Sequence, residues 1–521
     1  MGAEESIPLP APPPGFEYMV VYLTHYDRIR VNFGTQQEVE IIRQAIQDHW
    51  FRGLQSEKLK CGYSVTFKLN GMPFAVGGTS EGAAGVRQMV GQILLRLNAA
   101  GWDLILTSDL GRIFDLSTFY FVRRQVEPIQ YPLLCIAFSS YDKLQVINGS
   151  PDMINVIRGV IQSTWRRGIQ ADGSKGIYHE FKLSGNPWIG TGDESVNARL
   201  LTNNILIALA QRQMVLHCNA NLKSTADTLF FKYDPNVIPA QTANHFVISL
   251  NRNDRLRLIN APQPIIETVK QILSQYWSTR GGIQKERQYH ASWEFKLSGT
   301  PWWACGDEAV MSRFVMCKIL EGLQSQGWHV RAALDMCRRQ NDKSVLAFYQ
   351  SLPKIAPVVC LSFNDECKIR LINAPQEFVG LCRDIIQARW IKGIRDEKAL
   401  NTPCMAYQFK LFGNPWSGYS IVDGLHIRSM LCFILQMLAS RGWKLLISAD
   451  ISAKYVHRDK APDYPLDVHS WWFTYATEPQ QQHIAGGYGF TSSQYGFASP
   501  SASGMEFARP PSYEPATESN K

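Results

Sequence analysis

The stretch "FKLSGNPW" (181–188) recurs with small changes as "FKLNGMPF" (67–74), "FKLSGTPW" (295–302) and "FKLFGNPW" (409–416). Each copy begins 114 residues after the one before it. A period of that length is the size of a whole domain and exceeds the unit of a solenoid repeat. The sequence therefore predicts four tandem copies of one domain.

The four copies share one order of elements. A strand, a polar turn and a second strand come first, as in "HFVISLNRNDRLRLINAP" (245–262). A segment with apolar residues at helical spacing follows, and it ends at a Trp and a Gly, such as Trp277 and Gly281. The F-K-L-x-G-x-P strand, a second apolar helix and a last pair of strands complete the unit.

These elements predict an α+β protein, in which each unit is a ββαβαββ sheet with two helices on one face. The connections between units are short, so neighbouring units should pack against each other. The expected divisions are a Pro-rich disordered N-terminus (1–16), repeat domains at 17–125, 131–234, 244–350 and 356–476, and a disordered tail (477–521).

The repeated motif reads as structural. Its Phe and Leu alternate with Lys, which places them on the buried face of a strand, and Gly-x-Pro suits a turn. The Trp at its end, at positions 188, 302 and 416, is expected to be a buried packing anchor. The acidic turns Asp193-Glu194 and Asp307-Glu308 that follow could cap the second helix or serve as acid/base groups.

Composition gives few signs of catalysis. The 11 histidines fall at unrelated positions in the four units, and the 11 cysteines form no C-x-x-C pair. The sequence contains no H-E-x-x-H, Walker A or Rossmann glycine pattern. We therefore expect no catalytic residue, no metal site and no cofactor, and we rank an enzyme with one diverged unit as the third interpretation.

A basic stripe recurs on the second strand of each unit. Its members, which we treat as candidate ligand-binding residues, are Arg28, Arg30, Lys143, Arg255, Arg257, Lys368 and Arg370. Such residues can protect an edge strand from aggregation, or they can bind a phosphate-bearing ligand, an anionic membrane or an acidic protein. The formal net charge of +8 over 521 residues is mild and does not choose among these.

The two chain ends carry short motifs. Gly2 and Ser6 fit the pattern for N-myristoylation, which alone holds a protein to membranes only weakly. In the tail, Pro510, Pro511 and Tyr513 spell P-P-x-Y. This resembles the ligand motif of WW domains, including those of HECT-type ubiquitin ligases, and the resemblance implies a WW-domain partner.

The leading hypothesis is a non-enzymatic intracellular scaffold or adaptor with four domains and a recruiting tail. Its expected location is the cytoplasm, with peripheral membrane association as an option. The alternative is a protein that binds RNA or single-stranded DNA through the basic strands. Multivalency favours the scaffold, because weak sites on one array reinforce each other.

Overall fold

The computed structural model of the chain describes residues 8–76, 79–111, 115–223, 226–238, 244–337, 342–416, 420–452, 454–456 and 464–476. The chain divides into a compact unit that ends at Glu478 and a separate unit, Pro479–Lys521. The four domains lie in the first unit.

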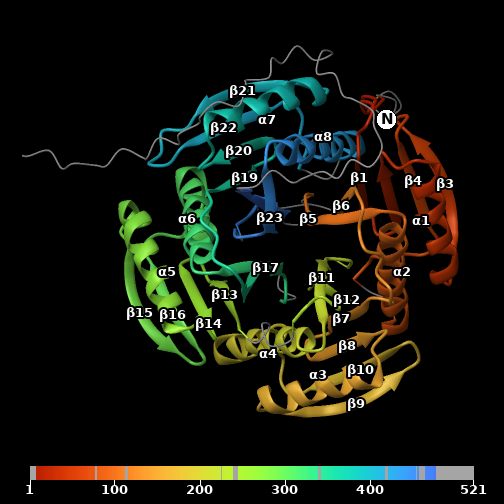
Figure 1. The fold of residues 1–521 in the computed structure, drawn as a ribbon, viewed down its shortest axis with the longest axis horizontal. Coiled ribbons are helices and arrows are strands. Elements are labelled where there is room, and N and C mark those ends of the chain that lie inside the picture. The colour runs from red at the N-terminus through yellow and green to blue at the C-terminus, as the bar shows by residue number, and fades with distance from the viewer. Residues whose placement is uncertain are drawn as a thin grey trace, which may run out of the picture. The chain divides into compact units, whose positions relative to one another are not determined.

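The first domain is one antiparallel six-stranded sheet with two helices (Figure 1). Its strands lie in the order β3-β4-β2-β1-β6-β5. In chain order its elements are β1 (Tyr18–Thr24), β2 (Arg28–Asn32), α1 (Gln36–His49), β3 (Leu54–Lys60), β4 (Ser64–Leu69), α2 (Ser80–Ala99), β5 (Trp102–Asp109) and β6 (Asp115–Arg123).

The other three domains repeat this strand order. The second contains β7 (Leu134–Ser139), β8 (Lys143–Ile147), α3 (Pro151–Thr164), β9 (Ile169–Lys175), β10 (Tyr178–Leu183), α4 (Gly192–Ala210), β11 (Met214–Ala220) and β12 (Thr228–Tyr233). The third contains β13 (His245–Asn251), β14 (Arg255–Ile259), α5 (Gln263–Tyr276), β15 (Ile283–Tyr289), β16 (Ser292–Leu297), α6 (Gly306–Ser325), β17 (Trp328–Leu334) and β18 (Val345–Gln350). The fourth contains β19 (Val358–Asn364), β20 (Lys368–Ile372), α7 (Gln376–Arg389), β21 (Ile394–Ala399), β22 (Ala406–Leu411), α8 (Ile421–Ser440), β23 (Trp443–Ala449) and β26 (Ser470–Tyr475), with a small insertion, β24 (Tyr455–Val456) and β25 (Tyr464–Pro465).

The predicted α+β class and the four tandem domains are confirmed, with one correction to the order of elements. The sequence predicted a single strand between the two helices, but each domain has two. The additional strands are β3, β9, β15 and β21. They are polar and largely exposed, as in "LQSEKLK" of β3, so no apolar alternation marks them in the sequence.

Each hydrophobic core is shared between two consecutive domains. The cluster around α1 and α2 of the first domain also contains Cys135, Cys218 and Phe230 of the second. The cluster of the fourth domain likewise contains Val20, Tyr22 and other residues of the first. A sheet therefore has its own helices on one face and the second helix of the preceding domain on the other. This explains why all seven residues of β1 are buried.

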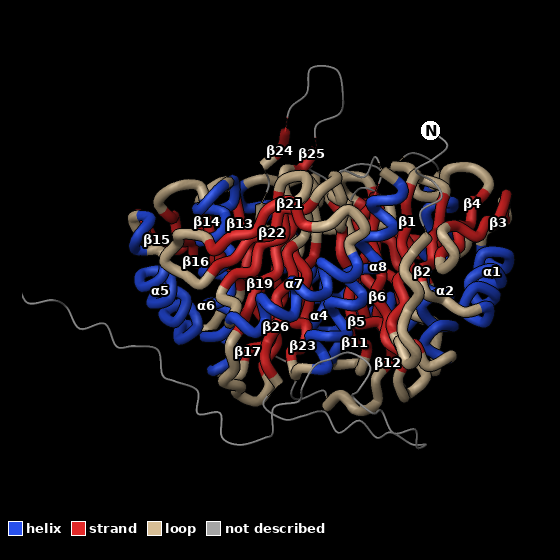
Figure 2. Tube along the Cα trace, turned by 90° about the horizontal axis from the view of Figure 1, so that it is seen from above, coloured by secondary structure: helices blue, strands red, loops and turns tan. Residues whose placement is uncertain are grey.

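The shared cores close the four domains into a ring. Helix α2 contacts β7 and β8, α4 contacts β13 and β14, α6 contacts β19 and β20, and α8 contacts β1 of the first domain. The innermost strands β5, β11, β17 and β23 contact one another at the centre (Figure 1). In both views α1 with β3 and α5 with β15 lie at opposite outer edges of the unit (Figure 2). Closure shields the inner edge strands, as it does in a propeller.

A pair of hydrogen bonds recurs at the centre of the ring, one between backbone groups and one from a backbone N–H to a side chain. The N–H of Ser117 donates to the carbonyl of Asn221 (3.1 Å), and the N–H of Asn221 donates to Oγ of Ser117 (2.8 Å). Asp227 with Asp335, Ser344 with Asp450, and His469 with Asp109 make the same pair of bonds. The last pair joins the fourth domain to the first. We call each contact between neighbouring domains a seam, and the seam that closes the ring has the same kind of hydrogen bonds as the other three.

The repeated motif behaves as the sequence predicted. Trp188, Trp302 and Trp416 are buried, and their indole N–H groups donate to the carbonyls of Lys143 (2.8 Å), Arg255 (3.0 Å) and Lys368 (3.3 Å). The motif glycines at 185, 299 and 413 have φ of 88°, 74° and 81°. Only glycine adopts this left-handed conformation without strain, which accounts for its recurrence.

The segment before β1 contacts the seam between the fourth and first domains. Leu9 is buried, and its N–H donates to the carbonyl of Cys61 (2.9 Å). The guanidinium of Arg389 donates to the carbonyl of Ala11 (3.2 Å), and Phe16 packs on Phe433. Residues 8–16, expected to be a disordered spacer, thus lie along this seam.

Among the described residues, α8 has the length and apolar composition that could cross a membrane. Most of that helix is buried inside the unit, between the sheets of the fourth and first domains.

Candidate functional site

A buried arginine on the second helix of each domain reaches into the next domain. These residues are Arg87, Arg199, Arg313 and Arg428, each at most 6% exposed. Arg87 and Arg428 donate to the hydroxyls of Thr228 (3.2 Å) and Thr118 (3.0 Å). The register of the sheets makes these two threonines equivalent. Three of these guanidinium groups also donate to groups of their own helix, at Ser195, Ala309 and Gly424. All four donate to residues of the next domain, so the arginines fasten neighbouring domains.

Two of these arginines meet a carboxylate as well. Arg199 donates to Asp342 (3.0 Å), and Arg313 donates to Asp467 (3.0 Å) and to Oγ of Ser470 (3.3 Å). The sequence analysis did not single out these arginines. The usable signal is an Arg at one place in all four apolar second helices.

The predicted basic residues of the third domain gather around one carboxylate. Arg255 (2.5 Å), Arg257 (2.8 Å) and Arg287 (2.9 Å) all pair with Glu294, which is 1% exposed. Burial alone would raise the pKa of Glu294, but hydrogen bonds and charge from these arginines outweigh it and lower the pKa. This stripe is neutralised inside its own domain.

The second and fourth domains also provide internal partners. In the second, Glu180 accepts from Lys175 (2.6 Å) and Gln145 (2.9 Å) and pairs with Lys143 (3.3 Å). In the fourth, Arg370 donates to Oε1 of Gln408 (3.0 Å), and Lys368 pairs with Asp365 (2.5 Å). The predicted stripes are therefore spread over separate sheets, and most are already engaged.

The first domain differs. Arg28 and Arg30 line a pocket of about 260 Å³ together with Lys58, Lys60 and Lys68. Five of the described lining residues are cationic, and none is Asp or Glu. The other lining residues are Ser56, Cys61 and Thr66 of the same sheet and Ile421, Val422 and Leu425 of α8. The structure thus groups two predicted residues with three others in a cationic pocket.

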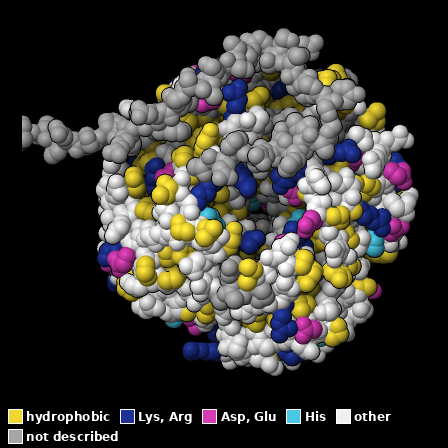
Figure 3. All heavy atoms as spheres, viewed as in Figure 1, with side chains coloured by type: hydrophobic (Ala, Val, Ile, Leu, Met, Phe, Trp, Pro, Cys, Tyr) yellow, Lys and Arg dark blue, Asp and Glu magenta, His cyan; other side chains and the backbone are white. Residues whose placement is uncertain are grey.

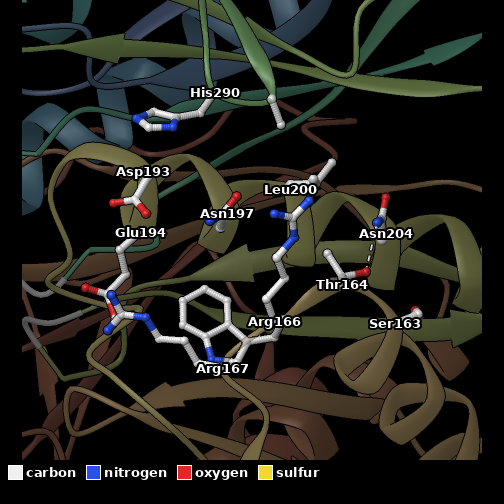
Figure 4. A pocket seen from close by; sticks show the side chains of 12 residues that line it. Ser163, Thr164, Arg166, Arg167, Asp193, Glu194, Asn197, Leu200, Asn204 and His290 are labelled. Carbon is white, nitrogen blue, oxygen red and sulfur yellow. Dashed lines mark hydrogen bonds and ion pairs between the residues drawn. The ribbon is translucent and has the colours of Figure 1, made fainter.

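A second pocket, of about 460 Å³, lies where the second domain meets the turn of β15 and β16 (Figure 4). Arg166 and Arg167 line one side, while Asp193 and Glu194 line another, and His290 points in from the third domain. Its charges are balanced. Arg167 pairs with Glu194 (3.3 Å), which leaves less capacity for a charged ligand.

The acidic turn residues brace the repeated motif. Glu194 accepts the N–H of Asn186 (2.8 Å), Glu308 that of Thr300 (2.7 Å), and Asp423 that of Asn414 (3.1 Å). Each carboxylate thereby fixes the Gly-x-Pro turn of its own domain. The predicted role as helix caps is wrong, because the N-cap residues of α4 and α6 are Thr191 and Cys305 and the acidic residues lie in the first turn of each helix. The contact to the motif turn is nevertheless a structural role for Glu194 and Glu308.

The centre of the ring holds a narrow pocket of about 120 Å³ that is lined by β5, β11, β17 and β23. Burial, together with the charge of Asp109, raises the pKa of Asp227 to about 7, and burial raises the pKa of Asp335 well above its usual value. Burial lowers the pKa of His217 to about 4. No group of described His, Cys, Asp and Glu residues here could hold a metal. Lys, Arg and His side chains also gather around a central hollow on the face drawn in Figure 3.

Several predicted site residues lie outside the described residues. These are Gly2 of the myristoylation pattern and Pro510, Pro511 and Tyr513 of the P-P-x-Y motif.

Comparison with known proteins finds one domain family. A single family model matches the chain four times, at residues 17–122, 132–232, 244–349 and 357–474. These matches cover most of the chain. A search of curated proteins found no match.

Proposed function

We propose that this chain, which belongs to the family defined by this domain and contains four tandem copies of it, is a non-enzymatic intracellular scaffold. In this proposal the four domains form one rigid platform, and the tail recruits a WW-domain protein through Pro510, Pro511 and Tyr513. A phosphate-bearing ligand or an anionic membrane would bind the platform.

The observation that carries the proposal is the sharing of every hydrophobic core between consecutive domains. Domains joined in this way cannot swing independently, so surfaces on different domains keep fixed distances. A rigid array suits a protein that holds several partners at once, because the second binding event then becomes intramolecular.

The polar clusters of the ring support a structural use. Each of these clusters has its partners inside the protein. The buried arginines bind across seams, the carboxylates bind the motif turns, and the groups at the centre bind each other in pairs. Nucleic-acid binding through the basic strands has less support, since Glu294 and Glu180 already pair with the stripes of two domains. Such binding requires a continuous cationic track along the nucleic acid.

The tail is tested in the full-length protein. Tyr513→Ala should abolish capture of a purified WW domain, because the aromatic ring fills the pocket beside the proline groove. Tyr495→Ala, a tyrosine of the same tail outside the motif, is the matched control and should leave capture unchanged. Thermal unfolding should be the same for both variants. Equal WW capture by the Tyr513→Ala protein would refute the recruiting role.

A further inference from the structure

We propose that the cationic pocket of the first domain binds a phosphate-bearing anion with two or more phosphate groups. The site lies at the seam of the fourth and first domains and is built from Arg28, Arg30, Lys58 and Lys68. Its ligand would occupy the place that the Glu294 carboxylate takes in the third domain. This inference does not depend on the tail.

The register of the sheets defines that place. Glu294 lies opposite Arg257 on the neighbouring strand, and Glu180 lies opposite Gln145. The corresponding neighbour of Arg30 is Thr66. The second and third domains thus have a glutamate at this position, whereas the first domain has the hydroxyl of Thr66. Thr66 lines the cationic pocket.

Arg30 is the feature that points to a ligand. Its side chain is 4% exposed, lines the pocket, and has an Nε atom without a hydrogen-bond partner. Its counterparts use this atom, since Nε of Arg257 donates to Glu294 (2.8 Å) and Nε of Arg370 donates to Gln408 (3.0 Å). A buried guanidinium N–H without an acceptor is costly, and an anion in the pocket would supply that acceptor.

The surroundings hold Arg30 in position. Its guanidinium carbon lies 5.9 Å from the ring centre of Tyr22, and that of Arg428 lies 4.5 Å from the same ring. Arg428 is committed to Thr118 and to the carbonyl of Gly424 (2.9 Å). The seam therefore places two guanidinium groups on one aromatic ring, and Arg30 lines the pocket.

The charge around the pocket suits a multivalent anion. Asp27 pairs with Arg28 (3.4 Å) and with Lys68 (3.9 Å), and it is not among the lining residues. Guanidinium groups bind phosphate oxygens through paired hydrogen bonds, and lysines add charge. Residues of the first turn of α8 line the opposite wall, so the positive end of that helix adds to the field. The charged side chains that line the pocket are all cationic, which favours an anion with more than one negative charge.

The location gives the ligand a consequence for the ring. The pocket is formed by strands of the first domain and the start of α8 in the fourth, so a bound anion would contact both domains at once. This seam joins the last domain of the chain to the first. Binding to the closed form alone would stabilise that form, by a free energy that rises with the logarithm of the ligand concentration above Kd.

The test uses the full-length protein with inorganic phosphate, pyrophosphate and tripolyphosphate at constant ionic strength. We expect affinity measured by calorimetry, and the rise in the unfolding temperature, to increase along this series. Thr66→Glu restores the internal carboxylate and should weaken tripolyphosphate binding by at least about ten-fold. Arg30→Gln introduces the residue that the second domain carries at this position, and it should have a similar effect.

Gln408→Glu is the matched control, because it adds the same charge at the same sheet position of the fourth domain. It should leave binding within about two-fold of the parent protein. The proposal is overturned if Thr66→Glu and Gln408→Glu weaken binding equally, or if the parent protein binds neither the free phosphates nor phosphoinositide vesicles.

A vesicle assay identifies the source of the phosphate groups. The protein is sedimented with phosphatidylcholine vesicles with and without phosphatidylinositol bisphosphate. Sedimentation that requires the phosphoinositide, and that Thr66→Glu abolishes, supports the site with a lipid headgroup as ligand. Binding of free polyphosphate without sedimentation supports the same site with a soluble ligand. Sedimentation that Thr66→Glu does not affect contradicts the assignment to this pocket.

Discussion

The Nη2 atom of Arg313 lies 3.0 Å from Oδ2 of Asp467, although the two residues belong to the third and fourth domains and both are buried. Two charges removed from water in this way stabilise a protein only as a pair. Arg313 and Asp467 can therefore pair only when the third and fourth domains are docked correctly. Arg199 and Asp342 repeat this relationship at the preceding seam.

Breaking this pair should be costly. We expect Arg313→Ala to lower the free energy of unfolding by about 3–5 kcal/mol, because Asp467 would remain as an uncompensated buried charge. Urea denaturation measures the change. Arg212→Ala, which removes a pair of similar length to Asp152 on the surface (2.9 Å), should cost about 1 kcal/mol or less. Similar losses for the two variants would show that the seam does not exclude water.

The repeated tryptophan offers a test of the motif. Trp302 is 1% exposed and donates to the carbonyl of Arg255. Trp302→Ala should destabilise the protein by about 3–5 kcal/mol, through a cavity and a lost hydrogen bond. Phe51→Ala, at a ring that is 72% exposed, serves as the control and should change stability by about 0.5 kcal/mol or less. A near-neutral Trp302→Ala would contradict the packing role.

The sequence was sufficient to predict the repeat, the class and the role of the motif, because these depend on local periodicity. The order of elements was incomplete because β3 and its counterparts have no apolar alternation. The seam residues were missed for another reason. Arg428 finds its partner Thr118 310 residues away in the chain, so no local pattern links them. The 114-residue repeat aligns Thr66 with Glu294, but the sheet register is needed to show that these residues face Arg30 and Arg257 on the neighbouring strand.

The central carboxyls predict how stability changes with pH. The pKa of Asp227 is raised to about 7 and that of Asp450 to about 6, by burial first. A folded state with such raised carboxyl pKa values binds protons more readily than the unfolded chain, so these groups make the protein more stable as the pH falls through 7. His217 acts in the opposite direction below its ordinary value of 6.5, because its folded pKa is lowered to about 4.

Burial also lowers the pKa of Lys223 to about 8, which opposes the carboxyl effect at and above that pH. The window in which the carboxyls dominate therefore lies between about pH 7.5 and pH 6.5. Within it, urea denaturation should show rising stability as the pH falls. Asp227→Asn keeps an oxygen for the N–H of Asp335 while removing its own titration, so this rise should be smaller in the variant, and Asp335 and Asp450 supply the part that remains. An identical pH dependence in the two proteins would show that Asp227 does not titrate in this range.

The last prediction concerns ring closure. If all four seams are equivalent, moving the chain ends to another seam should change the stability little, whereas removing a domain should lower it greatly. A circular permutant that joins residue 476 to residue 8 through a flexible linker, and that begins at residue 131, keeps every seam, including the contacts of Leu9 and Phe16. We expect it to unfold in one cooperative transition close to that of the parent chain.

Deleting residues 356–476 instead would expose the outer face of the first sheet, including Val20 and Tyr22, and the apolar surface of α6. That protein should aggregate or bind a hydrophobic dye, since exposed apolar faces of this size are not stable in water. A stable monomer after the deletion, measured by sedimentation, would mean that the domains fold independently and that closure is incidental.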